Sequence, residues 1–498
     1  MSIYWGDLHT HCGITYGYGS LENALIAAEK QLDFCAIIGH AMWPDIPENN
    51  EDLEYLVSYH KNGFKKLAEN WEYVRKTVNK ANQPEEFITF QGYEIHSREH
   101  GDHHIVSPDS NLPLLNDADS PHNLIKKLEP HKVIAIPHHI GYTPGYRGIN
   151  WDTFSSEISP IVEVYSKHGS SVSDKSMYKF LHTMGPRDSR NTVMSGLKQG
   201  NKFGFAASTD HHAGYPGSYG DGRIAVIAEE KTRDAIYNSI LSKKTYAVTG
   251  DKIKCEFRIN EGTIGDEIDA GKKKNINLNI EACDYLDKIV LYKNMKPWKI
   301  INGEFLNSSK KINKYKIRIE MGWGHDDTPY KWEGLAQIND GKLTSIEPCF
   351  RGRNVLAPDS KLKNTKNINR LNNKVIEKTE KEVSWQCTTF KNPSTRHSQT
   401  NSLLLELEGD ENTEINLSIN GVKKSYNIER LLQGSLSTHI ESYNSEAFVV
   451  HQALPENKYN IKLNWEDSTK EKPVDNYFVE IRQKNNQMAW ITPIYVRN

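Results

Sequence analysis

The chain carries near its start the stretch IYWGDLHTHC, residues 3–12, in which an apolar run leads directly into a His-x-His pair. Alternate residues of a β-strand point to the same face, so a strand ending here would direct His9 and His11 into one space. A single His-x-His pair is weak evidence of a metal site. Here it gains weight, because five later strand-like runs also carry His, Glu or Asp at or near an end.

Those five runs share one plan, in which a metal-binding residue type stands close to the end of an apolar strand. They are residues 37–40, 91–94, 103–106, 134–139 and 207–212, and the residues in question are His40, Glu94, His104, His138, Asp210 and His212. Nitrogen and carboxylate ligands at the ends of successive strands predict a barrel with metal ions in its mouth. Histidine is concentrated accordingly, with 16 of the 20 His in residues 1–250.

Length and composition exclude several classes of protein. A chain of 498 residues exceeds a single core and should divide into two or more domains. Its net charge of -2 provides no bulk attraction to nucleic acid or to an anionic membrane. We therefore expect no nucleic-acid or membrane partner, and a small anionic substrate would have to be held by local charges or by metal.

The six cysteines and the N-terminus bear on the cellular compartment. The cysteines are scattered and form no C-x-x-C pair, which predicts reduced, structural thiols. The first strand begins within five residues of the start, which leaves no room for a signal peptide, and no apolar run approaches transmembrane length. If the start is the native one, these features predict a cytoplasmic protein.

Residues 1–250 alternate short apolar strands with helical stretches, which predicts an α/β domain of parallel strands and crossover helices. Ser20 can cap the first helix. The expected helices are 21–28, 50–81, 120–128, 173–181, 188–199 and 231–242, and the further expected strands are 33–38, 87–90, 133–136, 161–165, 203–207 and 224–228.

After residue 250 the pattern changes to short alternating runs separated by polar turns, which predicts a second domain, an antiparallel β-sandwich over 251–498. We expect this domain to support the first or to form a homo-oligomer contact, and not to be catalytic by itself. Within it, residues 353–381 are rich in Lys and Asn and poor in large apolar residues, which predicts a surface loop or a partly mobile insertion.

The spaced signatures resemble the PHP family of metal-dependent hydrolases (polymerase and histidinol phosphatase). They are His9-x-His11, His40, Glu94, His104 with His138, and Asp210-x-His212. Residues 165–171, 217–222, 244–250 and 477–495 are similar to one branch of that family, the DUF3604 proteins. The resemblance implies a distorted (βα)7 barrel with two divalent ions and a third position, filled by Zn, Mn or Fe.

Carried over residue by residue, the resemblance also implies a set of ligands. His9, His11, Glu94 and Asp210 would hold one ion, Glu94 as bridge with His104 and His138 would hold the second, and His40 and His212 would belong to the third position. Tyr16 stands where many family members have an acidic residue or His. A phenol with a pKa near 10 is a poor ligand at neutral pH. We therefore predict a weak or empty third position, with Tyr16 lining the substrate pocket.

The expected chemistry follows from a two-metal centre. Ions about 3.5–4 Å apart share a water and lower its pKa towards roughly 7, which produces a metal-bound hydroxide. By analogy with the family, the expected reaction is hydrolysis of a small-molecule phosphoester. His40, His212 or His168 could protonate the leaving group. Further candidates for binding an anionic substrate are Arg147, Lys167, His168 and Arg223.

Two alternatives remain open from the sequence. In the first, the same chemistry hydrolyses a C–N or carboxylic ester bond. In the second, the protein is a non-catalytic metal-binding or ligand-binding module. The ligand assignment is also open at two places, because His139 and His211 adjoin His138 and His212 and could exchange roles with them. Three other histidines are expected to orient ligands or to face solvent, namely His96, His100 and His103.

Overall fold

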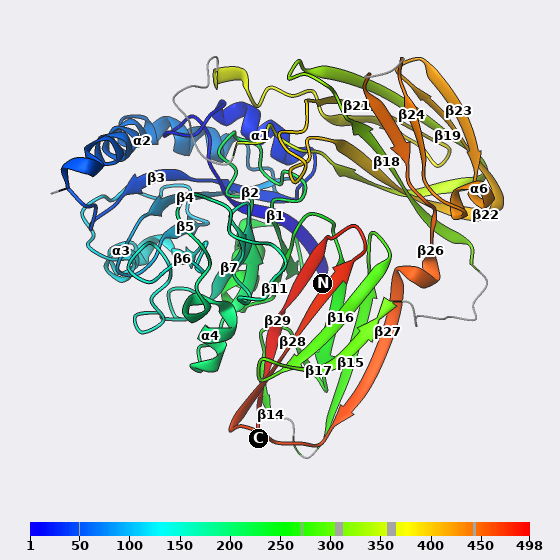
Figure 1. Ribbon diagram of the computed structural model, residues 1–498. Coiled ribbons are helices and arrows are strands. Elements are labelled where there is room, and N and C mark those ends of the chain that lie inside the picture. Colours follow the sequence, from blue (N-terminus) through cyan, green and yellow to red (C-terminus); the bar gives the residue numbers. More distant parts are fainter. Residues whose placement is uncertain (49, 270, 272, 304–311, 356–364, 442–444) are drawn as a thin grey trace.

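The computed structural model describes residues 1–48, 50–269, 271, 273–303, 312–355, 365–441 and 445–498. It shows a mixed α/β protein with more strand than helix. An α/β part built from the N-terminal half carries two β-rich bodies. One is formed by strands within residues 314–455, at the upper right of Figure 1, and the other by strands within residues 254–302 and 460–497, below it.

Six strands of the N-terminal half are hydrogen-bonded side by side. They are β1 (Ser2–Thr10), β2 (Phe34–Ile37), β3 (Gly39–Met42), β4 (Ile88–Ile95), β5 (His103–Ser107) and β6 (Ile134–Pro137). β1, β2 and β4 run parallel, as do β3 and β4, whereas β4–β5 and β5–β6 are antiparallel. A separate small sheet contains β7 (Ile161–Ser166), β8 (Gly169–Ser170) and β9 (Gly204–Ala207). An isolated bridge between Thr10 and His211 brings the chain after β9 next to β1.

The regular βα alternation expected for a (βα)7 barrel is not found in the described residues. β4 and β5 are joined by residues 96–102 alone, and a parallel crossover needs about a dozen residues or more, so the two strands pair antiparallel. β10 (Arg223–Ala228) and β11 (Thr245–Val248) are also antiparallel to their neighbours. The predicted strands themselves are confirmed, with shifted ends.

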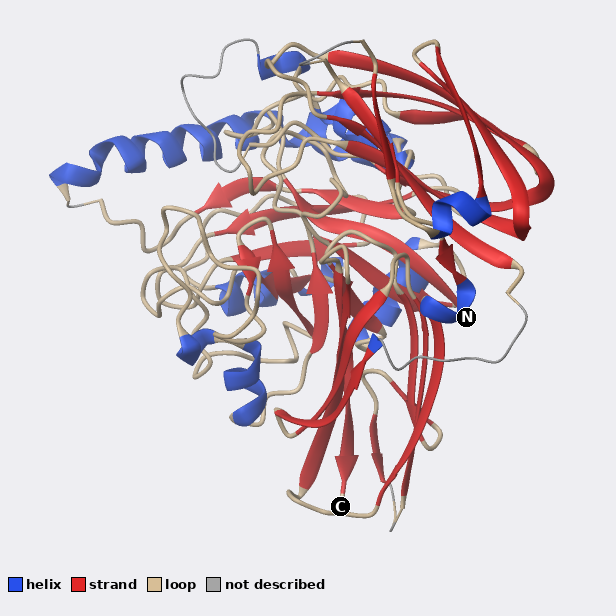
Figure 2. Ribbon diagram, turned by 45° about the vertical axis from the view of Figure 1, so that its right-hand side comes forward, coloured by secondary structure: helices blue, strands red, loops and turns tan. Residues whose placement is uncertain are grey.

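The helices lie on the outside of these sheets (Figure 2). They are α1 (Leu21–Glu29), α2 (Glu54–Lys80), α3 (Pro121–Lys127), α4 (Val193–Lys198) and α5 (Arg233–Leu241), with 3-10 turns at Glu51–Leu53, Glu129–His131 and Ser189–Asn191. The Ser20 side chain accepts a hydrogen bond from the Asn23 backbone N–H, which confirms the predicted cap. The helix predicted at 188–199 is interrupted at Thr192, whose backbone is extended and whose side chain caps α4.

The helix predicted at 173–181 is wrong. These residues form turns, and the Arg187 guanidinium donates hydrogen bonds to the carbonyls of Ser170, Asp174, Ser176 and Tyr178. These backbone carbonyls accept hydrogen bonds from the guanidinium and not from the backbone N–H groups that would pair with them in a helix.

The first β-rich body continues the main sheet across residue 250. Its strands are β12 (Lys254–Ile259), β13 (Gly262–Thr263), β14 (Glu267–Asp269), β15 (Lys274–Glu281), β16 (Leu286–Lys293), β17 (Lys296–Asn302), β27 (Asn460–Asp467), β28 (Val474–Gln483) and β29 (Met488–Arg497). β11 pairs with β29, and the sheet extends through β28 and β16 to β17. A second sheet, β13-β12-β15-β27, packs against it over a core that includes Phe257, Leu278, Leu291 and Ile481.

The second β-rich body is inserted between β17 and β27. It consists of β18 (Lys314–Gly322), β19 (Tyr330–Cys349), β20 (Lys374–Lys378), β21 (Glu382–Thr389), β22 (Asn401–Ile419), β23 (Val422–Asn427), α6 (Ile428–Leu432), β24 (Leu436–His439), β25 (Ala447–Val450) and β26 (Leu454–Pro455), with 3-10 turns at Thr365–Asn367 and Glu456–Lys458. The nine strands form one antiparallel sheet. Its core reaches Ala27 and Tyr215 of the N-terminal half.

The surface loop predicted at 353–381 lies partly outside the described residues. Within the described part, 374–378 form strand β20, so the loop expectation does not hold there. Asn369 is buried, and its amide donates to the Ser20 and Gly214 carbonyls. Buried amide bonds to α1 and to the chain after β9 explain why a segment poor in apolar residues still packs.

Asp251 connects the three parts of the molecule. Its buried carboxylate accepts hydrogen bonds from Arg318 at 2.8 Å, Tyr219 at 2.8 Å, Gln483 at 2.7 Å and Asn485 at 2.8 Å. Burial alone would raise the pKa of Asp251, but the Arg318 guanidinium and these donors lower it. One ionised carboxylate therefore joins the α/β part to both β-rich bodies.

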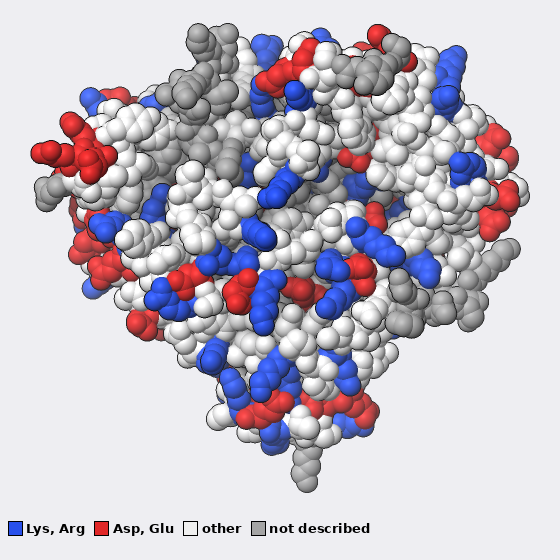
Figure 3. Space-filling view, viewed as in Figure 1, with Lys and Arg blue, Asp and Glu red and all other residues white. Residues whose placement is uncertain are grey.

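Positive and negative side chains are interspersed on the face shown in Figure 3, with acidic groups gathered near the start of α2. All six cysteines are buried and free, as the sequence predicted. Among the described residues, no helix combines the length and the apolar character needed to cross a membrane.

Candidate metal centre

Pairing between strands brings three of the candidate ligands together, His40, Glu94 and His104. His40 on β3 lies directly opposite Glu94 on β4, and Glu94 lies directly opposite His104 on β5. Residues opposite each other in adjacent strands have their Cβ atoms about 4.5–5.5 Å apart. Three positions far apart in sequence thus form one row across the sheet.

The Glu94 carboxylate lies between two sets of imidazoles. Its Oε2 is 3.3 Å from His11 Nε2, 3.5 Å from His40 Nε2 and 3.6 Å from His9 Nε2. Its Oε1 is 3.2 Å from His138 Nε2. Burial alone would raise the pKa of Glu94, but His96, His40 and His138 outweigh it and lower the pKa well below its usual value. An ionised carboxylate with one oxygen on each side is arranged as a bridge between two ions would be.

Asp210 closes the cluster from the loop after β9. Its Oδ1 is 3.2 Å from His11 Nε2, and its Oδ2 is 2.9 Å from His168 Nε2. The Asp210 backbone N–H donates to the His9 carbonyl at 2.8 Å, and its φ is +49°. This left-handed conformation, which Asp tolerates better than most residues, positions the carboxylate beside the end of β1.

The donor set fits divalent cations. Five groups of three residues each place ligand atoms within 4.8 Å of one another: His9 with His104 and His138, His11 with His40 and His212, His9 with His11 and Asp210, His40 with Glu94 and His96, and Asp102 with His138 and His139. His9 Nε2 and His11 Nε2 are 3.0 Å apart. Glu94 Oε2 and His104 Nε2 are buried without a hydrogen-bond partner in the described part of the chain. Buried nitrogens and carboxylate oxygens that converge in this way are typical of a site for Zn, Mn or Fe.

Hydrogen bonds to the outer nitrogens hold the imidazoles in place. His9 Nδ1 is 3.1 Å from Glu163 Oε2, and His11 Nδ1 is 2.9 Å from the Ile38 carbonyl. His40 Nδ1 is 3.0 Å from Thr15 Oγ1. In each case the partner occupies Nδ1 and leaves Nε2 facing the cluster, which is how metal-binding histidines are usually oriented.

Two acidic residues of the site escaped the sequence reasoning. Glu163 is the charged residue in the otherwise apolar strand β7, IVEVYS, and this was the signal that could have found it. Burial raises its pKa to about 7. Asp102 is buried, 3.1 Å from His96 Nδ1 and 3.4 Å from His139 Nε2, and it pairs with Arg147. It stands between Gly101 and His103, where no periodic pattern distinguishes it.

A cavity of about 660 Å³ opens over the cluster. Its floor includes Glu94 and Asp210, and its walls carry aromatic and apolar side chains together with two arginines. The wall residues are Tyr16, Trp43, Pro47, Leu53, Tyr55, Leu56, Tyr59, Arg98, Tyr146, Arg147 and Met184. A small organic substrate could therefore reach the candidate ligands.

The structure brings most of the predicted site residues to this cavity. His168 lines it, and its Nδ1 is 2.7 Å from the Tyr142 hydroxyl. Tyr16 also lines it, with its ring stacked on His40 and its hydroxyl 3.0 Å from His96 Nε2. Burial raises the pKa of Tyr16 well above its usual value, so the phenol is neutral. Of the histidines expected to orient ligands or face solvent, His96 is buried within the cluster itself.

Two predicted residues lie elsewhere. Arg223 is fully buried and donates to the Gly217 carbonyl, Gln31 and Glu347, so its guanidinium supports the junction with β19. Lys167 lines a different cavity, where its Nζ is 3.4 Å from Asp221. Of the adjacent histidines, His138 and His139 both line the metal-centre cavity, whereas only His212 of the second pair does.

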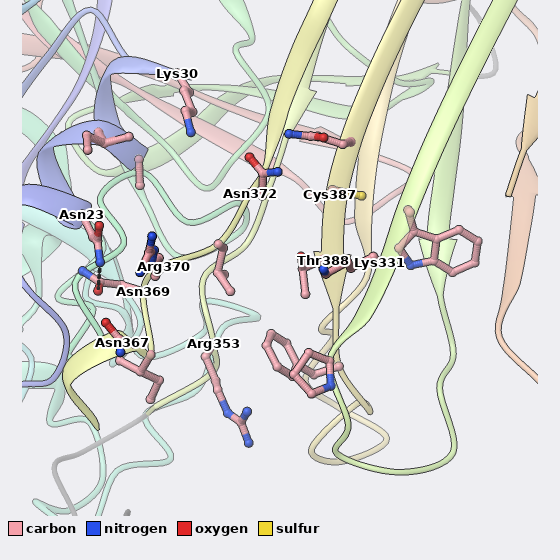
Figure 4. Close-up of a pocket in the computed structure, with 18 of the residues that line it drawn as sticks. Asn23, Lys30, Lys331, Arg353, Asn367, Asn369, Arg370, Asn372, Cys387 and Thr388 are labelled. Carbon is pink, nitrogen blue, oxygen red and sulfur yellow. Dashed lines mark hydrogen bonds between the residues drawn. The ribbon is translucent and has the colours of Figure 1, made fainter. Parts of the chain in front are cut away.

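A larger cavity, about 910 Å³, is separate from the metal centre. It lies between α1 and the nine-stranded sheet, and Figure 4 shows Lys30, Arg353 and Arg370 around it. None of the five potential ligand groups in the described residues lines it. Size alone therefore does not mark the site with metal-binding chemistry.

Comparisons with known proteins give limited similarity. No family model matches the chain. An uncharacterized protein of Chlamydia pneumoniae is 27% identical over 255 residues, which cover 48% of this chain and 40% of that protein. An uncharacterized protein of Chlamydia muridarum is 25% identical over 292 residues, which cover 54% of this chain and 45% of that protein. The matched region thus spans less than half the length of these relatives.

One solved structure is similar to part of the chain. It is a two-domain protein of Bacteroides vulgatus described as containing a predicted PHP-like metal-dependent phosphoesterase. The sequences are 13% identical, the match covers 60% of this chain and 85% of that chain, and the TM-score is 0.33. This TM-score is too low to establish a shared fold. Membership of the PHP family and of its DUF3604 branch remains a prediction from the sequence motifs.

Proposed function

We propose that this protein is a divalent-metal-dependent hydrolase that cleaves a phosphoester of a small molecule. The observation that carries the proposal is the position of Glu94, whose two carboxylate oxygens face different imidazoles in a buried cluster. His9, His11 and Asp210 would hold one ion, and His104 with His138 would hold the second. Ions bound here would activate water near neutral pH and polarise an oxygen of the substrate.

Arg147 is the best-placed cation for the anionic group of a substrate. Its side chain lines the cavity, and the nearest Arg147–Glu94 nitrogen–oxygen distance is 4.0 Å. Asp102 pairs with the Nε and Nη2 side of the guanidinium, whereas Nη1 contacts Met184 Sδ at 3.7 Å in the described residues. Nη1 can therefore donate a charge-assisted hydrogen bond to a phosphate or carboxylate oxygen.

His168 is the proposed proton donor to the leaving group. As proton donor the ring would be the imidazolium form, in which Nδ1–H donates to the Tyr142 hydroxyl oxygen and Nε2–H points to Asp210 Oδ2; loss of one proton leaves neutral imidazole. The Nε2 nitrogen faces the carboxylate at the floor of the cavity. His40 and His212 remain further candidates for this role.

The proposal extends to the family, the substrate, the location and the C-terminal half of the protein. We assign the protein to the PHP family, with a small anionic substrate, a cytoplasmic location, and a C-terminal half that supports the α/β part or mediates a homo-oligomer. The pairing of β11 with β29, which continues the main sheet into the C-terminal half, supports this role.

The test is metal analysis of the purified protein, followed by a hydrolase screen with added Mn, Zn or Fe. We expect bound metal and phosphate release from generic phosphoesters. Asp210→Asn should abolish hydrolysis and leave the circular dichroism spectrum unchanged, while the matched change Asp152→Asn at an exposed position should leave activity intact. Release of acid or amine without phosphate would instead favour C–N or carboxylic ester hydrolysis, and metal without either activity would favour a binding module.

A further inference from the structure

Two sequence segments outside the predicted metal ligands meet in a second cavity. Tyr165, Ser166, Lys167 and Gly169, at the end of β7, form one wall, and residues 218–221 form the next; His168 between them lines the metal-centre cavity instead. Residues 351–354 and 396–399 of the nine-stranded body complete it, together with Gln487 from the turn between β28 and β29. The cavity measures about 470 Å³, and all three parts of the molecule contribute to it.

The lining of this cavity carries a local excess of positive charge. Lys167, Lys179, Arg351 and Arg396 line it, and of the lining residues in the described chain only Asp221 is acidic. The whole chain has 62 Lys and Arg against 64 Asp and Glu, so a ratio of four to one is not a consequence of composition. A concave surface with one sign of charge attracts ligands of the opposite sign.

Lys167 is built into the wall without a short ion pair. Its side chain is 9% exposed, and its Nζ is 3.4 Å and 3.5 Å from the two oxygens of Asp221. Charge-assisted N–H···O bonds are usually about 2.7–2.9 Å long. A nearly buried ammonium with only long contacts retains the capacity to donate to a bound anion.

Arg351 offers a second donor, from the nine-stranded body. Its Nη1 donates to the Thr400 carbonyl at 2.6 Å and hydroxyl at 3.1 Å, while Nη2 makes no hydrogen bond within the described chain. Gly220 has φ +91°, and a Cβ placed there would be 3.8 Å from Nη2. The glycine thus accommodates a left-handed turn and leaves the space beside the guanidinium free of a side chain.

We propose that this cavity binds the phosphate group of a small phosphorylated molecule, at a site separate from the metal centre. Lysine and arginine donors from different parts of the molecule suit a compact oxyanion with several acceptor oxygens. The volume exceeds what one phosphate fills, and Tyr165, Tyr178 and Tyr219 line the remainder, so an organic group can accompany it. Because all three parts of the molecule contribute walls, the bound ligand stabilises their arrangement.

The site also adjoins the metal centre. The Lys167 backbone N–H donates to the Thr209 carbonyl at 3.2 Å, and the next residue, His168, contacts Asp210. The inference does not depend on the proposed hydrolase function, because none of the four cations belongs to the metal cluster. A ligand here could be free phosphate, including the product of the proposed reaction, or a phosphorylated organic molecule.

The test is calorimetric titration of the full-length protein with inorganic phosphate and, separately, with phenylphosphonate, at constant ionic strength. We expect saturable binding that persists when Asp210→Asn disables the metal centre. Lys167→Met and Arg396→Met should each weaken it about tenfold or more. Lys167→Arg should retain most of it, and the exposed, non-lining control Lys175→Met should bind like wild type.

The two titrations distinguish free phosphate from a phosphorylated organic molecule. Tighter binding of phenylphosphonate would identify an organic phosphate as the ligand, and tighter binding of inorganic phosphate would identify the free ion. Arg396 is exposed and makes no side-chain hydrogen bond within the described chain, so Arg396→Met tests the site even if Lys167→Met fails to fold. Binding that disappears with Asp210→Asn, or that is indifferent to both Lys167→Met and Arg396→Met, would overturn the proposal.

Discussion

His9 Nδ1 lies 3.1 Å from Glu163 Oε2, while Nε2 of the same ring faces His11, Glu94 and Asp210. Burial alone would lower the pKa of His9, but the carboxylates of Asp210 and Glu163 raise it well above its usual value. Both nitrogens of one imidazole are thus committed, the outer one to a buried carboxylate and the inner one to the candidate metal centre. Glu163 fixes the ring orientation without facing the cluster itself.

Glu163→Gln should therefore weaken metal binding without unfolding the protein. Loss of a carboxylate behind a metal-binding histidine typically lowers metal affinity about 10- to 100-fold. The measurement is competition with a chromogenic chelator, with the exposed Glu157→Gln as matched control. Equal metal affinity in Glu163→Gln and wild type would show that the His9–Glu163 contact has no role in a metal site.

Glu94→Gln should lower the bound metal by more than the loss of one ligand's worth of affinity would. The two oxygens face different imidazoles, and a neutral amide cannot bridge two cations through a shared charge. Metal counting by inductively coupled plasma mass spectrometry after dialysis provides the readout, with the exposed Glu86→Gln as control. Unchanged stoichiometry together with altered stability would identify Glu94 as a structural carboxylate instead.

A third ion should be weakly bound or absent. The Tyr16 phenol is neutral and stacks on His40, and its hydroxyl contacts His96. We expect two bound ions per chain in wild type and also in Tyr16→Phe. The measurement combines metal counting with anomalous scattering, both on protein loaded with excess Mn. His96, which the sequence placed outside the ligands, joins His40 and Glu94 as a possible alternative set. Three fully occupied positions would contradict this prediction.

His168→Gln should lower kcat about 10²- to 10⁴-fold and leave the metal content unchanged. This is the range expected when a general acid is lost. The decisive readout is the pH profile, in which the limb due to the acid should disappear, together with a KM that changes little. His100→Gln provides the control, since His100 does not line the cavity and its Nδ1 contacts Thr153. A loss of metal in His168→Gln would make His168 a support of Asp210.

The nine-stranded body should show a pH-dependent contribution from Glu320. Burial alone would raise the pKa of this carboxyl, but hydrogen bonds from His451 and Thr400 lower it to about 2. Because the pKa is lower in the folded state, the ionised carboxylate stabilises the protein fully at pH values above the unfolded-state pKa near 4.5. This contribution is lost as the pH falls towards the folded-state pKa of about 2.

Glu320→Gln should therefore cost about 2 kcal/mol of unfolding free energy at pH 7, a cost that shrinks as the pH falls below about 4.5. Urea unfolding followed by tryptophan fluorescence at several pH values measures it, with the exposed Glu411→Gln as control. A difference from wild type that stays constant between pH 7 and pH 2.5 would contradict the assignment.

Local sequence patterns were enough to predict the strands and the residue types near their ends. His9, His40, Glu94, His138 and Asp210 could be named because each lies in a strand or within three residues of a strand end, and strand periodicity is a local property. The alternation of apolar and polar residues after residue 250 likewise predicted antiparallel pairing, which β12, β15 and β27 form.

Which of those residues meet, and which charges surround them, depends on how distant segments pack. Glu163 contacts His9 across 154 positions of sequence, and β11 pairs with β29 across the two halves of the chain. Lys167 and Arg223 carry the same charge type as Arg147, yet only Arg147 reaches the metal-centre cavity. Contacts of this kind depend on the path of distant segments, and a pattern read within a short window contains no information about that path.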